Sequence, residues 1–146
     1  MNRNSLFLLC AVIAVGIAAF YASNSAGVKQ DIDASASPQG AAIVVVNVPD
    51  VLSATAKMGK QAYDAKCASC HGNNAEGQDG IAPPLIHKIY EPSHHGDEAF
   101  QRAAKLGVRS HHWPFGDMPP VEGLTRADVG AVVAYIREVQ RENGIN

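Results

Sequence analysis

Two cysteines and a histidine lie together in the five-residue run Cys67-Ala68-Ser69-Cys70-His71. C-x-x-C-H is the attachment signal for c-type haem. Two thiols three positions apart, on one turn after a helix, can reach the two vinyl groups of one porphyrin, and the next residue then points an imidazole at the iron. Half of a zinc site and an incidental pattern are the alternatives. Haem is favoured because no second C-x-x-C or clean ligand pair follows at a usable spacing.

The N-terminal segment is a membrane-targeting sequence. Residues 6–22 carry no charge and no proline, and Arg3 is the only charged residue before them. This stretch is longer than a signal-peptide core of about 7–15 residues and just reaches the lower limit for a spanning helix. Residues 1–22 are therefore predicted to be a signal-anchor or a cleaved signal peptide. The chain is expected on the periplasmic side of a bacterial inner membrane, anchored or, if cleaved, soluble.

The rest of the chain is predicted to be a linker and one small domain. Residues 23–49 are rich in Ala, Ser, Gly and Gln, which is typical of a tether. Within them the β-branched run 43–48 is either a short strand or an extended arm on the domain surface. Residues 50–146 then form one domain. The formal net charge of -2 gives no support to nucleic-acid binding.

Three helices are predicted in this domain, which makes it all-α. The first spans about 53–66, and the second spans about 97–106, starting at the acidic cap position Asp97. The last opens with the capping-box pair Thr125 and Asp128 and ends before Gly144. Its apolar stripe consists of Val129, Val132, Val133, Ile136 and Val139. Residues 72–95, rich in Gly and Pro, are predicted to be mostly loop.

At this point residues 53–142 resemble the class I c-type cytochromes, in particular the small single-haem bacterial ones. Gly59, Tyr63 and Cys67 recur at intervals of four, as in the family's first helix. There the glycine lets the C-terminal helix cross closely and an aromatic packs beside it. Tyr135, in the run 134–136, is similar to the aromatic of the last helix that meets them. The resemblance implies a cytochrome c fold, with three to four helices and long loops wrapped around one covalently bound haem.

The resemblance also implies a set of site residues. Cys67 and Cys70 would hold one haem c, with His71 and Met118 as the two axial ligands of the iron. The carbonyl of Pro83 would accept a hydrogen bond from the far nitrogen of His71. The remaining predicted site residue, which would line the haem, is Leu85.

Two histidine runs depart from the family pattern, His94-His95 and His111-His112-Trp113. His111 or His112 lies near enough to Met118 in sequence to compete for the iron. A second metal held by the two His pairs is a further alternative. The favoured reading places these side chains on loops at the haem edge, where an imidazole or Trp113 could donate to a propionate. His87 has no assigned role.

An iron bound by both His and Met has no open position, so the site stores one electron. No Ser/His/Asp set or Gly-rich phosphate loop competes with this reading, and the protein is not expected to be an enzyme. We expect an electron carrier between periplasmic or inner-membrane partners, such as a respiratory complex, a terminal oxidase or a periplasmic dehydrogenase. The alternative is a haem-containing subunit or gas sensor in which Met118 is labile. The response of the reduced protein to carbon monoxide distinguishes the two.

Overall fold

The computed structural model describes residues 38–146 of the chain. The predicted membrane segment 1–22 and residues 23–37 of the predicted linker lie outside the described residues. Among residues 38–146, no helix is long and apolar enough to cross a membrane. The described part is helical, without a named strand, and it contains four α-helices and one short 3-10 helix. This composition is consistent with a cytochrome c fold.

Helix α2 spans Ala54–Lys66 and begins where the sequence predicts. The hydroxyl of Ser53, the N-cap residue, accepts a hydrogen bond from the backbone N–H of Ala56 at 3.2 Å. This bond satisfies one of the free amides at the helix start. The buried residues of α2 are Ala56, Gly59 and Tyr63. They lie on one face because they are spaced three and four apart.

Helix α5 spans Arg126–Glu142 and confirms the predicted capping box. The Thr125 side chain accepts from the backbone N–H of Asp128, and the Asp128 carboxylate accepts in return from the Thr125 N–H at 2.8 Å. All five residues of the predicted apolar stripe are buried, together with Tyr135, Arg137 and Gln140. The helix therefore presents a wider buried face than the stripe indicates.

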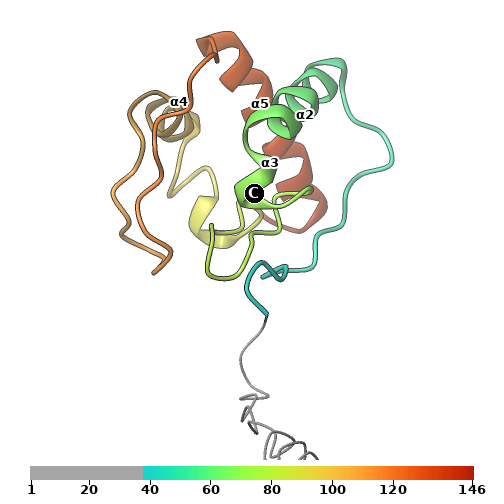
Figure 1. Cartoon of the computed structure of the whole chain (residues 1–146). Coiled ribbons are helices and arrows are strands. Elements are labelled where there is room, and N and C mark those ends of the chain that lie inside the picture. Colours follow the sequence, from blue (N-terminus) through green and yellow to red (C-terminus); the bar gives the residue numbers. More distant parts are fainter. Residues whose placement is uncertain (1–37) are drawn as a thin grey trace, which may run out of the picture. The chain divides into compact units, whose positions relative to one another are not determined.

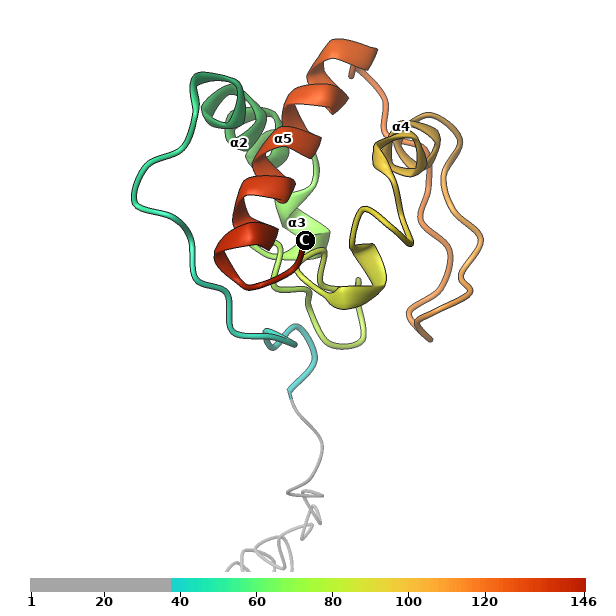
Figure 2. The same ribbon diagram turned by 180° about the vertical axis from the view of Figure 1, so that it is seen from behind.

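Helices α2 and α5 cross at a single glycine. A Cβ built on Gly59 would lie 1.8 Å from the carbonyl oxygen of Ala131, so only a residue without a side chain allows this approach. One turn further along, the rings of Tyr63 and Tyr135 pack with centroids 5.4 Å apart. Figures 1 and 2 show the two helices crossing at the centre of the domain. The close approach expected from Gly59 is thus present.

Helix α4 spans Asp97–Leu106 and differs from the prediction at its first residue. Gly96 is the N-cap, and no side chain caps the helix there, so Asp97 is the first helical residue rather than the cap. An acidic side chain in the first turn still interacts favourably with the helix dipole. The prediction erred by one position because both uses of an acidic residue produce the same sequence pattern. Between α3 (Ala68–His71) and α4 lies a long loop with the 3-10 helix η1 (Lys88–Tyr90).

Residues 38–48 run in an extended arm along the surface of the domain. The N–H of Gly40 donates to the carbonyl of Asp79 at 2.8 Å, and the N–H of Asp79 donates back to Ala41 at 2.8 Å. Further along, the Asn47 N–H donates to the Asn143 side chain at 2.9 Å. Of the two alternatives for residues 43–48, the structure shows the arm. These contacts tie the last part of the predicted 23–49 linker to the domain.

Candidate haem-binding site

The two cysteines of the motif lie on a tight turn at the end of α2. Cys67 caps α2 and leads directly into α3, where its carbonyl accepts from the backbone N–H of Cys70 at 3.1 Å and of His71 at 2.9 Å. Both thiols are free; Cys67 is half-buried and Cys70 is exposed. Burial, and then the neighbouring Cys70, raise the pKa of the Cys67 thiol to about 11. Two unpaired thiols one turn apart match the reach of two thioether bonds.

His71 is the most buried member of the motif and is fixed by one hydrogen bond. Its Nδ1 lies 2.8 Å from the carbonyl oxygen of Pro83. A carbonyl can only accept, so Nδ1 carries the proton and Nε2 keeps a free lone pair. Burial lowers the pKa of His71, and the bond to Pro83 opposes this only in part. The ring is therefore held neutral, with a lone pair that can bind a metal.

The loop after α3 brings Pro83 back to His71. The N–H of Gly77 donates to the His71 carbonyl at 2.8 Å, and the N–H of Leu85 donates to the Ala75 carbonyl at 2.9 Å. Gly77 has a φ of +75°, and a Cβ there would lie 2.5 Å from the backbone nitrogen of Pro84. The turn thus requires glycine for both its conformation and its space. Leu85, like Cys67 and Ala68, is partly buried and packs against the hydrophobic core, which fits an apolar lining residue.

Met118 lies on a different loop, residues 107–120, which is closed by one antiparallel β-bridge to Val108. Its N–H donates to the carbonyl of Val108 and its carbonyl accepts from the Val108 N–H, both at 2.9 Å. Both views in Figures 1 and 2 show this loop on one side of the domain, away from α3 in the plane of the picture. The other described methionine, Met58, is 59% exposed on α2. Met118 is thus held by its backbone, whereas Met58 faces solvent.

Trp113, on the same loop, has an indole N–H that is buried and has no hydrogen-bond partner within residues 38–146. The nearby Tyr90 hydroxyl does not accept from it in hydrogen-bond geometry, and burial raises the pKa of Tyr90 to about 12 although Trp113 opposes the shift. An unpaired buried donor is costly and calls for an acceptor. A haem propionate would be such an acceptor. Together with the free thiols and the Nε2 lone pair of His71, this donor shows that the residues present fit a haem.

The histidines that the sequence places on loops form one group. The Nε2 atoms of His94 and His112 lie 3.4 Å apart, and the rings of His111 and His112 have centroids 4.3 Å apart. Loss of hydration, and then repulsion from His111, His95 and His94, lower the pKa of His112. His87 stands apart. It accepts from the Ile89 N–H at 3.2 Å and packs its edge against Trp113.

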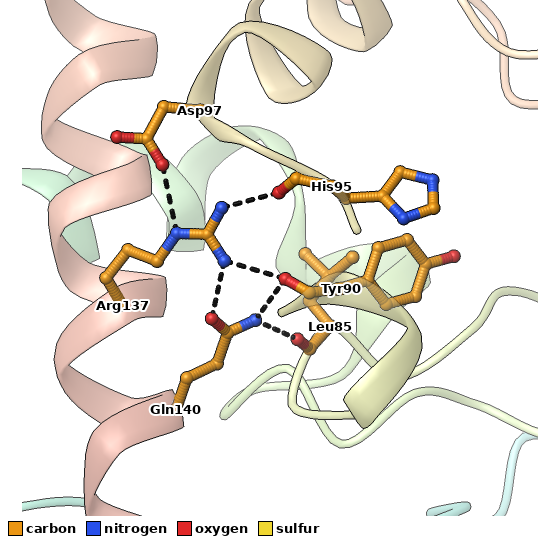
Figure 3. Close-up of polar contacts among 6 residues, drawn as sticks. All are labelled: Leu85, Tyr90, His95, Asp97, Arg137 and Gln140. Atoms are coloured by element: carbon orange, nitrogen blue, oxygen red, sulfur yellow. Dashed lines mark hydrogen bonds and ion pairs between the residues drawn. The ribbon is translucent and has the colours of Figure 1, made fainter. Parts of the chain in front are cut away.

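Sequence reasoning missed two buried polar residues that hold the loops in place. Arg137 donates to the carbonyls of Tyr90 and His95 at 2.6 Å each and to Asp97 at 3.0 Å. Gln140 donates to the carbonyls of Leu85 and Tyr90 at 2.9 and 3.0 Å (Figure 3). The available signal was their spacing. Both residues continue the stripe of α5 at helical intervals from Val133 and Ile136.

Comparison with known protein families gives one match. The cytochrome c family model matches residues 56–140, more than half of the chain, and this range contains the C-x-x-C-H motif, Met118 and most of α2 and α5. Comparisons with curated proteins and with solved structures gave no match. The family implies haem c and haem-based electron transfer. From the geometry of the motif and from this match, the chain belongs to the cytochrome c family.

Proposed function

We propose that this protein is a single-haem c-type cytochrome that carries one electron between periplasmic or inner-membrane redox partners. The observation that carries the proposal is the 2.8 Å contact between His71 Nδ1 and the Pro83 carbonyl. A carbonyl that accepts a hydrogen bond from one ring nitrogen fixes the orientation of the imidazole and makes the opposite nitrogen a stronger metal ligand. Zinc-bound histidines use the same arrangement, but the adjacent Cys67 and Cys70 in C-x-x-C-H order favour haem.

Met118 is the sixth ligand in this proposal. Its backbone is fixed by Val108, and Gly107 allows the chain to pass within a distance that a Cβ would block, at 2.5 Å from the Met118 carbonyl. The backbone at Met118 is therefore already ordered, and only its side chain loses conformational freedom when the thioether binds the iron. Two permanent ligands leave no position for a substrate, so the chain acts as a carrier rather than an enzyme.

The bound haem supplies reversible one-electron chemistry at the iron. The chain's own residues supply its setting. Leu85 would help to exclude water from the haem, Trp113 would donate its free N–H to it, and the buried His71 would offer the Nε2 lone pair to the iron. Cys67 and Cys70 would hold the haem, and the exposure of Cys70 supports an attachment site near the surface, where a redox partner could approach.

Carbon monoxide tests the ligand assignment on the full-length protein. The ferrous wild-type protein should be indifferent to carbon monoxide, because Met118 occupies the sixth position. Met118→Ala should open the iron, so that carbon monoxide shifts the Soret band, and it should lower the reduction potential. Met58→Ala is the matched control, since this exposed methionine should change neither property.

Two results would contradict the proposal in different ways. Ready binding of carbon monoxide by the wild-type protein would show that Met118 is a labile ligand and would favour a gas sensor or a haem-containing subunit. If the Met118→Ala protein still does not bind carbon monoxide, the result would indicate that a histidine is the sixth ligand. The electron-carrier role would survive only the second result.

The cellular place of the protein is a separate part of the proposal. We assign residues 1–22 to an inner-membrane anchor that leaves the haem domain in the periplasm, where respiratory complexes, a terminal oxidase or a dehydrogenase can exchange electrons with it. The apolar run 6–22 after Arg3 supports this. Carbonate-washed membranes should retain full-length protein with its original N-terminus. Native protein that starts after residue 22 would instead be periplasmic and soluble.

A further inference from the structure

Three histidines from two separate loops converge outside the haem-binding site. His94 and His95 precede α4, and His112 comes from the loop 107–120. One ring nitrogen of each lies within 4.8 Å of the others. Neither the haem chemistry nor the packing of the core uses these side chains.

The distance between two of these nitrogens is long for a hydrogen bond and fits a metal site. His94 Nε2 and His112 Nε2 are 3.4 Å apart. A hydrogen bond from N–H is usually about 2.7–3.2 Å long. In a tetrahedral zinc site, bonds of about 2.0–2.1 Å place neighbouring nitrogens about 3.3–3.4 Å apart, whereas right-angled geometry gives about 2.9 Å. The separation of this pair equals the edge of such a tetrahedron, and the nitrogen of His95 lies within 4.8 Å of both.

His95 is already oriented in the way that a metal ligand requires. Its Nδ1 lies 2.6 Å from the carbonyl of Ile89, so Nδ1 carries the proton and Nε2 keeps its lone pair. Its own carbonyl accepts from Arg137 at 2.6 Å, as Figure 3 shows. Both the ring and the backbone of this residue are therefore fixed. A carbonyl behind a ligating imidazole is the usual second partner in metal sites.

The loop that supplies His112 is also closed without any ion. The β-bridge between Val108 and Met118 joins its ends, and the Ser110 N–H donates to the Asp117 carboxylate at 2.8 Å. The Ser110 hydroxyl donates to the carbonyl of Trp113. The two loops thus meet with their imidazoles in place, so little ordering remains when an ion binds.

A simple pair of neutral imidazoles explains the group less well. Such a pair accounts for His94 and His112 but not for the third ring beside them. Within residues 38–146, no ion pair to a carboxylate involves these histidines. A hydrogen bond between His94 and His112 engages only two of the three ring nitrogens, whereas a cation at the centre can bind all three.

We propose that His94, His95 and His112 form a binding site for one divalent transition-metal ion, with Zn²⁺ as the best fit. Imidazole suits Zn²⁺, and tetrahedral spacing disfavours square-planar Cu²⁺. Three protein ligands leave the fourth position to water. The ion joins the segment before α4 to the loop that carries Met118. It is a site separate from the haem.

Isothermal titration with Zn²⁺ alone tests the site on the chelator-treated, full-length holoprotein at about pH 7.5, where free histidine is neutral. One ion should bind per chain, and His94→Gln or His112→Gln should each weaken binding by at least about tenfold. His111→Gln is the matched control, because it removes a neighbouring imidazole and should leave affinity within about threefold. An unchanged Soret spectrum shows that each variant has folded around its haem.

Hydrogen exchange provides a second readout. Zn²⁺ should slow exchange in residues 89–96 and 107–118 together in the wild-type protein, but not in His112→Gln. Absence of saturable binding, or equal binding by wild type and His94→Gln, overturns the site. A loss in His111→Gln as large as in His112→Gln overturns the three-residue ligand set. Because haem ligation is measured separately by carbon monoxide, failure here leaves the proposed electron carrier intact.

Discussion

Replacing Gly59 with alanine should destabilise the protein, although alanine favours helices. The added Cβ would lie 1.8 Å from the Ala131 carbonyl oxygen, where ordinary contact begins at about 3.4 Å, so α2 and α5 must separate by about 1.6 Å. The obstacle is backbone and cannot rotate away. Overpacking of this kind costs about 3 kcal/mol. The higher helix propensity of alanine offsets about 1 kcal/mol of this cost, so the free energy of unfolding should fall by about 2 kcal/mol.

Guanidinium unfolding of the ferric holoprotein, followed by far-ultraviolet circular dichroism, measures this loss. With an m-value of about 3 kcal/mol/M, the midpoint should fall by about 0.7 M. Gly130→Ala is the matched control on α5, since its new Cβ would meet nothing nearer than the Gln101 side chain at 3.9 Å. That variant should be as stable as the wild type or more stable. A Gly59→Ala midpoint at or above that of wild type would refute the role of this contact.

Three further predictions follow from the site and its supports. Cys67→Ser or Cys70→Ser should remove most of the haem that remains with the polypeptide on a denaturing gel; unchanged haem staining would rule out thioether attachment. Arg137→Met should lower the free energy of unfolding by about 3 kcal/mol because it leaves the His95 carbonyl and the Gln140 side-chain oxygen without this donor, whereas Asp97→Asn, at an exposed partner, should cost under about 1 kcal/mol. Bonds from Thr125 lower the pKa of Asp128, so its stabilisation is present above its unfolded pKa of 3.8 and lost as pH falls through the lower folded value. The stability difference between wild type and Asp128→Ala at pH 6 should therefore shrink near pH 2, and a constant difference would contradict the assignment.

Local signals in the sequence determined the helices and the position of His71. Ser53 and the Thr125–Asp128 pair bond to amides three residues away. The residues that define these two helix starts therefore lie within one turn of each other in the sequence. The C-x-x-C-H motif is likewise complete in five residues. The first residue of α4 was predicted wrongly because its N-cap, Gly96, makes no side-chain hydrogen bond. A glycine cap therefore lacks the residue pattern that identifies other helix starts.

The resemblance to a family added contacts that no local pattern contains. Pro83 was expected beside His71 from the family, and the 2.8 Å contact agrees with it. The same holds for Gly59, whose partner Ala131 lies on the last helix. Neither partner follows from periodicity, because periodicity identifies a face of a helix and not what packs against it.

Contacts between distant parts of the chain were decided only by the tertiary structure. Asn47 bonds to Asn143 across 96 positions, and Arg137 bonds to the carbonyl of His95 across 42. His94 meets His112 only because two loops are held side by side. Every residue has a backbone carbonyl, so a side chain can donate to the carbonyl of any residue type. The sequence at the accepting position therefore does not reveal the contact. Sequence alone therefore determined which groups are available, and the fold decided which of them meet.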